Sequence, residues 1–339
     1  MLEIVSSGNY QRWNEIVRSM LDYDFYHLAE YHQLDNDGQT FLLYYTENKV
    51  GFALPIVLRA IDNTDFCDIT SVYGYAGPLA NIQNPNPAAV SAFHQELSRF
   101  FDDHSVVSVF SRLHPLFPEQ EKLLSGLGNV IDTNLTVGID LSLTNAEQKQ
   151  QYVHSLKNTI NRFKRRNMVT KLAETEAEID AFAAIYIENM KRVNASPMYY
   201  FTSAYFHQFL HTINSSLMLA ILDGKIICGS LFTECNGIIQ AHLSATSNEY
   251  LKQSPLKYVW NQIRLLGMEK NERILHFGGG AGGKNDSLFQ FKSQFSHLYF
   301  QFKVWKHIHN QEVYDELIRE IKKDGVSTPS YFPLYRLTN

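Results

Sequence analysis

The stretch YYTENKVGFALPI, residues 44–56, decides the fold, because its pattern returns in AILDGKIICGSLF, residues 220–232. Each stretch reads as a β-strand, a polar turn, a lysine, a β-branched residue, a glycine and a second strand. A further strand and a helix follow each of them. Self-similarity at half the length of the chain indicates a duplicated domain.

The rest of the chain predicts mixed helices and strands without a regular alternation of the two, which is typical of the α+β class. Periodic apolar residues and the Asn-Gly and Asp-Gly turns mark the elements. We expect two tandem domains with mixed, mainly antiparallel sheets, over residues 1–145 and 146–339. The expected helices cover residues 10–21, 86–104, 152–168 and 255–271, and the expected strands lie within residues 40–60, 66–80, 106–113, 134–143, 216–247, 273–280 and 297–308.

The composition is that of a large globular protein. The 339 residues are 45% hydrophobic, which allows a large core, and the net charge of -5 provides no basic field for DNA. Three cysteines without disulfide or zinc spacing are expected to be reduced core thiols. We find no signal-peptide core and no run of about 18 apolar residues, and we expect a cytoplasmic protein with no transmembrane segment.

A glycine-rich run, HFGGGAGGKNDSLFQFKSQFS, covers residues 276–296 and satisfies two nucleotide-binding patterns. Three of its glycines fit G-x-G-x-x-G, but no acidic residue follows about 20 residues later on a second strand. Lys284 ends a G-x-x-x-x-G-K run, but Asn285 supplies no hydroxyl for a metal ion. We favour a structural bend, in which Gly279 and Gly280 approach a ligand or another backbone closely.

Lys292 follows this run in a short helix or turn. Phe291 and Phe295 lie beside it, so that its ammonium group is expected among aromatic rings. An isolated lysine is usually a solvated surface charge. In these surroundings it could instead stabilise an oxyanion or a phosphate.

The bend DITSVYGYAGPL (residues 68–79), taken with the glycine-rich run, resembles the FemAB-type aminoacyltransferases and their BioF2-like acetyltransferase relatives. The resemblance spans nearly the whole chain. It implies two tandem GNAT-like domains, with the acyl-CoA N-acyltransferase fold. It also implies transfer of an acyl group, often an amino acid from aminoacyl-tRNA, to an amine such as that of a peptidoglycan precursor.

The resemblance also implies roles for individual residues. Phe291 and Lys292 match the Phe-Lys pair of the family, in which Lys292 would be the catalytic residue that stabilises negative charge at the reacting carbonyl or on the tRNA end. The acceptor would be bound by residues of the bend, namely Tyr73, Tyr75 and Gly77.

Two segments depart from the patterns of these relatives. Fem-type enzymes often carry an arginine in the bend and an aspartate after it, whereas this chain has no basic residue there and has Asn81 in place of the carboxylate. We keep Asn81 as a candidate acceptor contact. Relatives that use acetyl-CoA have a glycine loop whose amides hold the pyrophosphate, but residues 247–258, SNEYLKQSPLKY, contain no glycine.

Two further clusters have open interpretations. Lys157, Arg162 and Arg165 lie on the helix expected at 152–168, either as a phosphate cradle for a nucleotide-linked acceptor or a tRNA stem, or as an ordinary solvated face. Tyr199 lies in an aromatic segment that could line the substrate cleft or belong to the core. The thirteen histidines show no zinc pattern, so we expect no metal site.

The first hypothesis is therefore an N-acyltransferase that acts on an amine of a cell-wall precursor or of an amino sugar in a surface polysaccharide. Its carbonyl would be held in a gap between strands of the second domain. The donor would be aminoacyl-tRNA or acyl-CoA as co-substrate, without a further cofactor. The alternative is a non-catalytic module of the same fold that binds a nucleotide-sugar or RNA.

Overall fold

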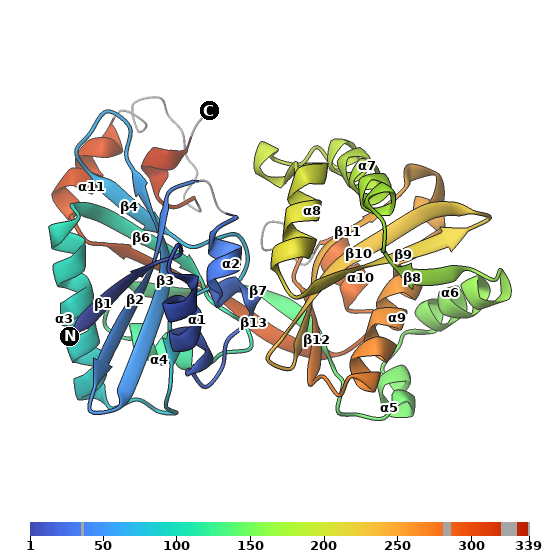
Figure 1. Cartoon of the computed structure of the whole chain (residues 1–339), viewed down its shortest axis with the longest axis horizontal. Coiled ribbons are helices and arrows are strands. Elements are labelled where there is room, and N and C mark those ends of the chain that lie inside the picture. Colours follow the sequence, from blue (N-terminus) through green and yellow to red (C-terminus); the bar gives the residue numbers. More distant parts are fainter. Residues whose placement is uncertain (35–36, 281–285, 320–330, 338–339) are drawn as a thin grey trace. The chain divides into compact units, whose positions relative to one another are not determined.

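The computed structural model describes residues 1–34, 37–280, 286–319 and 331–337, except for the side chain of Met198. These residues form two compact units (Figure 1). Unit 1 comprises Met1–Thr133 and Gln301–Asn339, and unit 2 comprises Asn134–Phe300. The chain passes between the units inside two strands, β7 and β13.

Unit 1 has a mixed sheet in the order β1-β2-β3-β4-β6-β13, with β5 paired to β3. All of these pairs are antiparallel except β4 with β6. Its strands are β1 (Leu2–Ser6), β2 (Gln39–Glu47), β3 (Val50–Ala60), β4 (Cys67–Thr70), β5 (Leu79–Ala80), β6 (Val106–Arg112) and β13 (Leu298–Ile308).

Unit 2 repeats this plan in the order β8-β9-β10-β11-β12-β7, again with one parallel pair, β11 with β12. The repeated order confirms the predicted duplication and the α+β class. Its strands are β7 (Asn129–Asp140), β8 (Val169–Leu172), β9 (Ser215–Leu222), β10 (Lys225–Cys235), β11 (Ile238–Thr246) and β12 (Ile274–Gly278).

The last strand of each sheet comes from the other half of the sequence. Residues 137–140 of β7 follow unit 1 in the chain but pair with β12, and residues 304–308 of β13 follow unit 2 but pair with β6. The division therefore differs from the predicted one at residues 145 and 146, because residues 301–339 belong to unit 1. Strand pairing at this distance leaves no local signal in the sequence.

Helices cover the sheets of both units. Those of unit 1 are α1 (Tyr10–Arg18), α2 (Ala29–His32), α3 (Pro87–Asp103), α4 (Glu119–Leu124) and α11 (Gln311–Leu317), with 3-10 turns η1 (Phe25–His27) and η5 (Leu334–Arg336). Those of unit 2 are α5 (Asn145–Gln150), α6 (His154–Arg165), α7 (Glu176–Arg192), α8 (Ser203–Thr212), α9 (Leu256–Glu269) and α10 (Ser287–Lys292), with 3-10 turns η2 (Pro197–Tyr199) and η3 (Asn248–Gln253). No helix among the described residues is long and apolar enough to cross a membrane.

The hairpin turns have the chemistry that the sequence predicts. Asn48 and Lys49 join β2 to β3 with positive φ at both positions, and Asp223 and Gly224 join β9 to β10 in the same way. Two-residue turns with positive φ match the right-handed twist of the strands that they connect. The stretches 44–56 and 220–232 therefore both form β-hairpins, and their turns have the same backbone conformation.

The core of unit 1 lies between the sheet and α3. Phe93 and Phe101 of α3 are fully buried and belong to one apolar cluster with Phe52 of β3 and Val106 of β6. Trp305 of β13 completes this cluster, although β13 follows unit 2 in the chain. The exchanged strand is therefore part of the hydrophobic core of unit 1.

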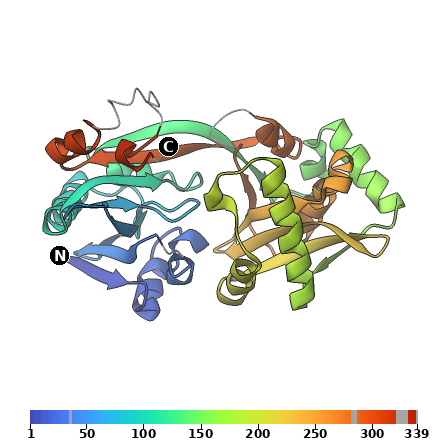
Figure 2. The ribbon, with the colours of Figure 1, turned by 90° about the horizontal axis from the view of Figure 1, so that it is seen from above.

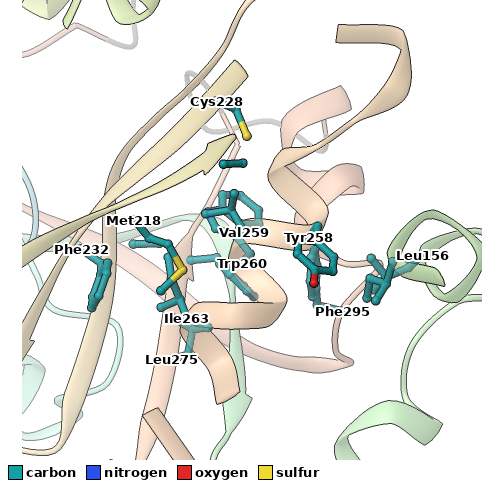
Figure 3. Close-up of a cluster of buried hydrophobic side chains, with 14 of the residues drawn as sticks. Leu156, Met218, Cys228, Phe232, Tyr258, Val259, Trp260, Ile263, Leu275 and Phe295 are labelled. Carbon is teal, nitrogen blue, oxygen red and sulfur yellow. The ribbon is translucent and has the colours of Figure 1, made fainter. Parts of the chain in front are cut away.

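The sheet of unit 2 is covered on both faces. Val259, Trp260 and Ile263 of α9 pack with Met218 of β9 in one buried cluster (Figure 3). Helix α7, yellow-green in Figure 2, covers the opposite face. There the ring of Phe182 in α7 lies so close to Gly229 that a Cβ atom on this glycine would meet it at 2.7 Å. Alternate residues of a strand point to opposite faces, so both faces of this sheet are apolar.

Candidate functional site

Lys292 is the last residue of α10, and its side chain is buried, with 8% of the residue exposed. Its Nζ donates a hydrogen bond to the carbonyl oxygen of Gly279 at 2.5 Å. Asp286 caps α10, since its carboxylate accepts from the backbone N–H of Phe289 at 2.8 Å. The structure thus brings together the predicted Lys292 and Gly279, which are 13 residues apart in the sequence.

The ammonium group of Lys292 is largely shielded from solvent. Burial lowers the pKa of Lys292 to about 8, and the carboxylate of Asp286 opposes this shift. The ammonium form still predominates at pH 7. Only one of its three N–H donors has an acceptor among the described residues, so the group can stabilise a developing negative charge.

Gly279 and Gly280 follow directly after β12. A Cβ atom on Gly279 would meet Asn134 Nδ2 at 2.5 Å and the carbonyl oxygen of Leu135 at 2.9 Å. The glycine therefore permits the close approach of two backbones that the sequence suggested. Gly280 is half-buried, whereas Lys284 and Asn285 lie outside the described residues.

The strands β11 and β12 diverge next to Lys292. They pair only over Ile238–Gln240 and Ile274–His276, after which β11 continues to Thr246. Beyond Gln240, none of the described strands pairs with β11 on the side of β12. An unpaired strand edge offers backbone N–H and C=O groups to a ligand.

His276 closes the base of this divergence. Its Nδ1 lies 2.6 Å from Gln240 Oε1 and its Nε2 lies 2.8 Å from Thr136 Oγ1, and the residue is fully buried. Both ring nitrogens are engaged, so this histidine is a structural residue and not an available base.

Phe291, the residue before Lys292 in α10, belongs to a wall of aromatic rings. Phe291 is half-buried and packs edge-on against Trp260 with 5.4 Å between ring centroids. Trp260 in turn packs against Phe277 in a tilted arrangement with 4.6 Å between ring centroids, and its Nε1 donates to Ser230 Oγ at 3.2 Å. Trp260 was not among the predicted site residues, because an apolar helix position looks like ordinary core.

Lys257 is a second lysine at this wall that sequence reasoning missed. It lies in the first turn of α9, and its Nζ is 5.3 Å from the ring centroid of Phe291. Lys257, Asn261 and Arg264 follow one another at helical spacing and all are buried. This buried polar stripe on an otherwise apolar helix is the signal that could have found it.

The basic helix of the prediction is α6. Leu156, Ile160 and Phe163 form its buried face, while Lys157 and Arg165 are exposed. Arg162 donates a hydrogen bond to the backbone carbonyl of Gln253 at the end of η3. The structure therefore places Arg162 against the start of α9 and leaves Lys157 and Arg165 as a solvated cationic face.

Tyr199 is half-buried in η2, and its carbonyl oxygen accepts from the hydroxyl of Tyr186 at 2.9 Å. This contact belongs to the packing between α7 and the segment before α8. Nearby, Tyr205 lies 3.4 Å from Nε2 of His242 through its hydroxyl oxygen. No described contact joins Tyr199 to Lys292.

The remaining predicted residues lie in unit 1. Tyr75 belongs to the bend at residues 68–79, here called the Tyr-Gly-Pro bend. Its ring centroid lies 5.7 Å from that of Tyr26 and 5.9 Å from that of His114. The backbone carbonyl of Tyr73 accepts from the hydroxyl of Tyr31 at 2.7 Å. The bend is therefore supported by aromatic packing from η1 and α2.

Gly77 and Asn81 have structural partners in unit 1. Gly77 has φ +96°, and a Cβ atom there would meet Gln120 Oε1 at 2.7 Å. The side chain of Asn81 accepts from the N–H of Gly51 at 2.8 Å and donates to the carbonyl of Lys49 at 2.9 Å. Asn81 thus uses both of its polar atoms on the β2–β3 turn, and an acceptor contact by its side chain would have to displace these bonds.

A buried polar network under the bend was not predicted. The carboxylate of Asp24 lies 3.1 Å from Nε2 of His114, and both residues are buried. Gln120 accepts from the N–H of His114 at 2.6 Å and donates to the carbonyl of Ala76 at 2.9 Å. Burial raises the pKa of Asp24 to about 7 and lowers that of His114 to about 3, which favours a neutral pair.

Among the described residues, no group of three or more His, Cys, Asp or Glu side chains could hold a metal ion.

A small hollow of about 110 Å³ in unit 1 is lined by Asp22, Pro78, Phe117, Glu119 and others. Glu119 is engaged there with Asn84 and Lys122.

Comparison with known proteins identifies the fold class. No protein-family model and no curated protein matches the chain. Its fold is that of tandem GNAT-like proteins, as expected from the FemAB-type resemblance. Among solved structures, FemX is similar with a TM-score of 0.74 at 11% identity, covering 93% of this chain and 99% of that chain.

Two further structures share this fold. A conserved protein of unknown function from Bacteroides thetaiotaomicron has a TM-score of 0.62 at 10% identity, with 91% of this chain and 100% of that chain covered. L-PGS from Bacillus licheniformis has a TM-score of 0.58 at 11% identity, with 94% and 97% covered. At such identities the likeness shows the fold alone.

Proposed function

We propose that this protein is an acyltransferase that moves an acyl or aminoacyl group onto an amine, with Lys292 as the residue that stabilises the oxyanion. The observation that carries the proposal is the buried ammonium group of Lys292 beside the divergence of β11 and β12, held by the carbonyl of Gly279. A cation preorganised in a poorly hydrated site acts strongly on charge that develops in the transition state.

The reaction needs little beyond positioning. The lone pair of a neutral amine attacks the carbonyl carbon, and the carbonyl oxygen becomes an oxyanion near Lys292. Collapse of the intermediate forms the amide and breaks the bond to the leaving oxygen or sulfur, which takes up a proton while the amine loses one. A neutral amine is already nucleophilic, so orientation and oxyanion stabilisation supply most of the rate enhancement.

The start of α9 supports aminoacyl-tRNA over acyl-CoA as the donor. Its first backbone donors are used internally, because the N–H of Lys257 reaches the carbonyl of Ser254 and that of Tyr258 reaches the carbonyl of Pro255. The preceding segment forms η3, in which the N–H of Tyr250 bonds to Ser247. Few amides therefore remain to hold a pyrophosphate, whereas exposed cations on α6 suit an RNA backbone.

The proposed acceptor is the amine of a cell-wall precursor or of an amino sugar in a surface polysaccharide. This part rests on the resemblance to FemAB-type enzymes and on the fold shared with FemX. The residues expected to bind the acceptor are those of the bend in unit 1. A lipid acceptor is the variant to include in a test, because the fold is shared with a domain of a putative lysylphosphatidylglycerol synthetase.

The test offers the purified protein charged tRNA or acetyl-CoA with a panel of amine acceptors and follows products by mass spectrometry. Lys292→Ala is expected to lower kcat by about 10²–10³-fold with little change in donor affinity, as for the loss of an oxyanion donor. Lys191→Ala, at an exposed position in α7, is the control and should keep full activity. Absence of turnover with both donors would leave the non-catalytic binding module as the better hypothesis.

A further inference from the structure

Arg264, in the middle of α9, is a fully buried cation that the proposed chemistry does not use. Its guanidinium group donates from Nη1 to Gln148 Oε1 at 2.7 Å and from Nη2 to Asn145 Oδ1 at 2.8 Å. Both acceptors are neutral amides of α5. In the part of the chain that the structure describes, Arg264 has no carboxylate partner, and its Nε is buried without an acceptor.

Burial of this charge costs folding free energy. It lowers the pKa of Arg264, and Tyr152 opposes the shift. An apolar side chain of similar volume would fill the same place at lower cost. What an apolar side chain lacks is the planar guanidinium group, which makes two hydrogen bonds in fixed directions. The feature that calls for a role is therefore the geometry of Arg264 and not its charge.

Arg264 fixes the residues that follow α5. Its Cζ lies 5.8 Å from the ring centroid of Tyr152, which is buried two residues beyond the end of α5. The hydroxyl of Tyr152 donates to Asn261 Oδ1 at 3.2 Å, and the same oxygen accepts from Arg264 Nη2 at 3.4 Å. The segment between α5 and α6 is thus held against the middle of α9.

This segment in turn bonds to the turn that follows α10. The N–H of Val153 donates to the carbonyl of Gln294 at 3.1 Å. Gln151 Oε1 accepts from the hydroxyl of Ser296 at 3.0 Å. The chain directly after Lys292 is therefore tied to the segment between α5 and α6 by a backbone bond and a side-chain bond.

An aromatic contact completes the connection to Lys292. The ring of Tyr152 packs edge-on against Phe295 with 5.6 Å between ring centroids. Phe295 is fully buried and belongs to the same apolar cluster as Trp260 (Figure 3). Its N–H donates to the carbonyl of Lys292 at 3.1 Å. Contacts therefore run without a break from Arg264 through Tyr152 and Phe295 to Lys292.

We propose that Arg264 is a positioning residue for Lys292: it fixes the segment between α5 and α6, and that segment fixes the end of α10, so that the ammonium group of Lys292 reaches the carbonyl of Gly279. This inference rests on the proposed function and adds the residue that sets the place of its lysine. A helix of six residues has few hydrogen bonds of its own, so α10 depends on such outside contacts.

Arg264→Lys tests the role of geometry, because it keeps the positive charge and loses the planar fork. Lysines of the full chain are labelled with carbon-13 at Cε, and the signal that Lys292→Met removes is followed by NMR against pH. In Arg264→Lys, Lys292 is expected to become better hydrated, so that its titration midpoint rises from about 8 by roughly 1 pH unit. In a turnover assay kcat is expected to fall by about tenfold with little change in KM.

Two further variants separate positioning from general stability. Phe182 of α7 is fully buried on the other face of the sheet of unit 2, so Phe182→Leu should lower the Tm but leave the titration of Lys292 unchanged. Gln151→Leu, at a half-buried position, removes the bond to Ser296 with less risk to the fold. It should shift the titration in the same direction as Arg264→Lys.

The result that would overturn the inference is an unchanged midpoint of Lys292 in a folded Arg264→Lys variant, or an equal shift in Phe182→Leu. If Arg264→Lys does not fold, the midpoint in Gln151→Leu decides in the same way. A shifted midpoint in a protein that shows no turnover with either donor would retain the positioning role and reject the proposed function. Turnover that requires Lys292, with a midpoint that neither variant moves, would retain the function and reject the positioning role.

Discussion

Single residues in the Tyr-Gly-Pro bend show how a short sequence motif depends on distant partners. Gly74 has φ +115°, and a Cβ atom there would lie 2.0 Å from the ring of Tyr26. Tyr26 itself is buried and packs against the rings of Tyr31 and Tyr75. The glycine is therefore required both by its backbone conformation and by the ring that fills the space of a side chain.

Substitution of Gly74 by alanine is expected to destabilise unit 1 by about 2–4 kcal/mol, because backbone strain and a steric clash act together. Gly126→Ala is the matched control: Gly126 has φ +90° but no atom within 4 Å of an added Cβ, so it reports backbone strain alone, about 1 kcal/mol. Urea unfolding of the two variants measures the difference. Equal destabilisation would show that Tyr26 can move aside.

Buried histidines predict a loss of stability in acid. Burial lowers the pKa of His27, His32 and His114 to about 3 from an ordinary value of 6.5. Below pH 6.5 the unfolded chain binds protons that the folded chain refuses, so the free energy of unfolding falls as the pH falls. Asp24, whose pKa is raised to about 7, acts in the opposite direction and offsets part of this loss.

His32→Gln tests this account. Nε2 of His32 lies 3.0 Å from the carbonyl of Tyr26, while its Nδ1 has no partner. The variant should be less stable at pH 7, but its further loss between pH 7 and pH 5 should be smaller by about 2 kcal/mol, the contribution of one histidine. Urea unfolding at both pH values provides the measurement, and an unchanged loss between them would contradict the assignment.

At the scale of elements, α10 is a six-residue helix with its cap, Asp286, at one end and Lys292 at the other. The Asp286 side chain caps the first turn, and its charge also raises the pKa of Lys292 against the effect of burial. The two effects can be separated, because asparagine caps a helix about as well as aspartate but carries no charge.

Asp286→Asn is therefore expected to change stability by less than about 0.5 kcal/mol while lowering the pKa of Lys292. If protonated Lys292 is the active form, the alkaline fall in kcat near pH 8 should move to lower pH in this variant. A pH–rate profile measures the shift. Asp286→Ala, which also removes the cap, should additionally lose about 1 kcal/mol of stability. A profile unchanged in both variants would exclude Lys292 as the titrating group.

Local elements were predictable, whereas the arrangement around Lys292 was predictable only in part. The β9–β10 turn needs only Asp223 and Gly224, which are adjacent in the sequence. The lysine could be singled out by its aromatic neighbours. Its acceptor, the carbonyl of Gly279, and the second lysine at position 257 required the packing of α9 against α10, which no sequence pattern encodes.

At the scale of the whole molecule, each unit is completed by a strand from the other half of the chain. Trp305 of β13 is fully buried in the core of unit 1, and its Nε1 donates to the carbonyl of Leu127 at 2.6 Å. Removal of residues near the C-terminus is therefore expected to affect unit 1 and not unit 2.

Trp305→Ala should destabilise the protein by about 3–5 kcal/mol, the cost of deleting a large buried side chain. In hydrogen exchange, amides of β2, β3 and β6 should lose protection while those of β9 and β10 keep it. Tyr299→Ala, at an exposed position of the same strand, should have a small effect. Loss of protection confined to unit 2 would contradict the exchange of strands.

The sequence by itself determined the duplication, the hairpins and the glycine bends, because periodicity and turn chemistry act over a few neighbouring residues. Only the tertiary structure decided to which unit β7 and β13 belong, and which carbonyl accepts the hydrogen bond from Lys292. These features depend on strand pairing and burial between residues far apart in the chain. Such contacts follow from the total free energy of packing, in which each residue contributes only a small share.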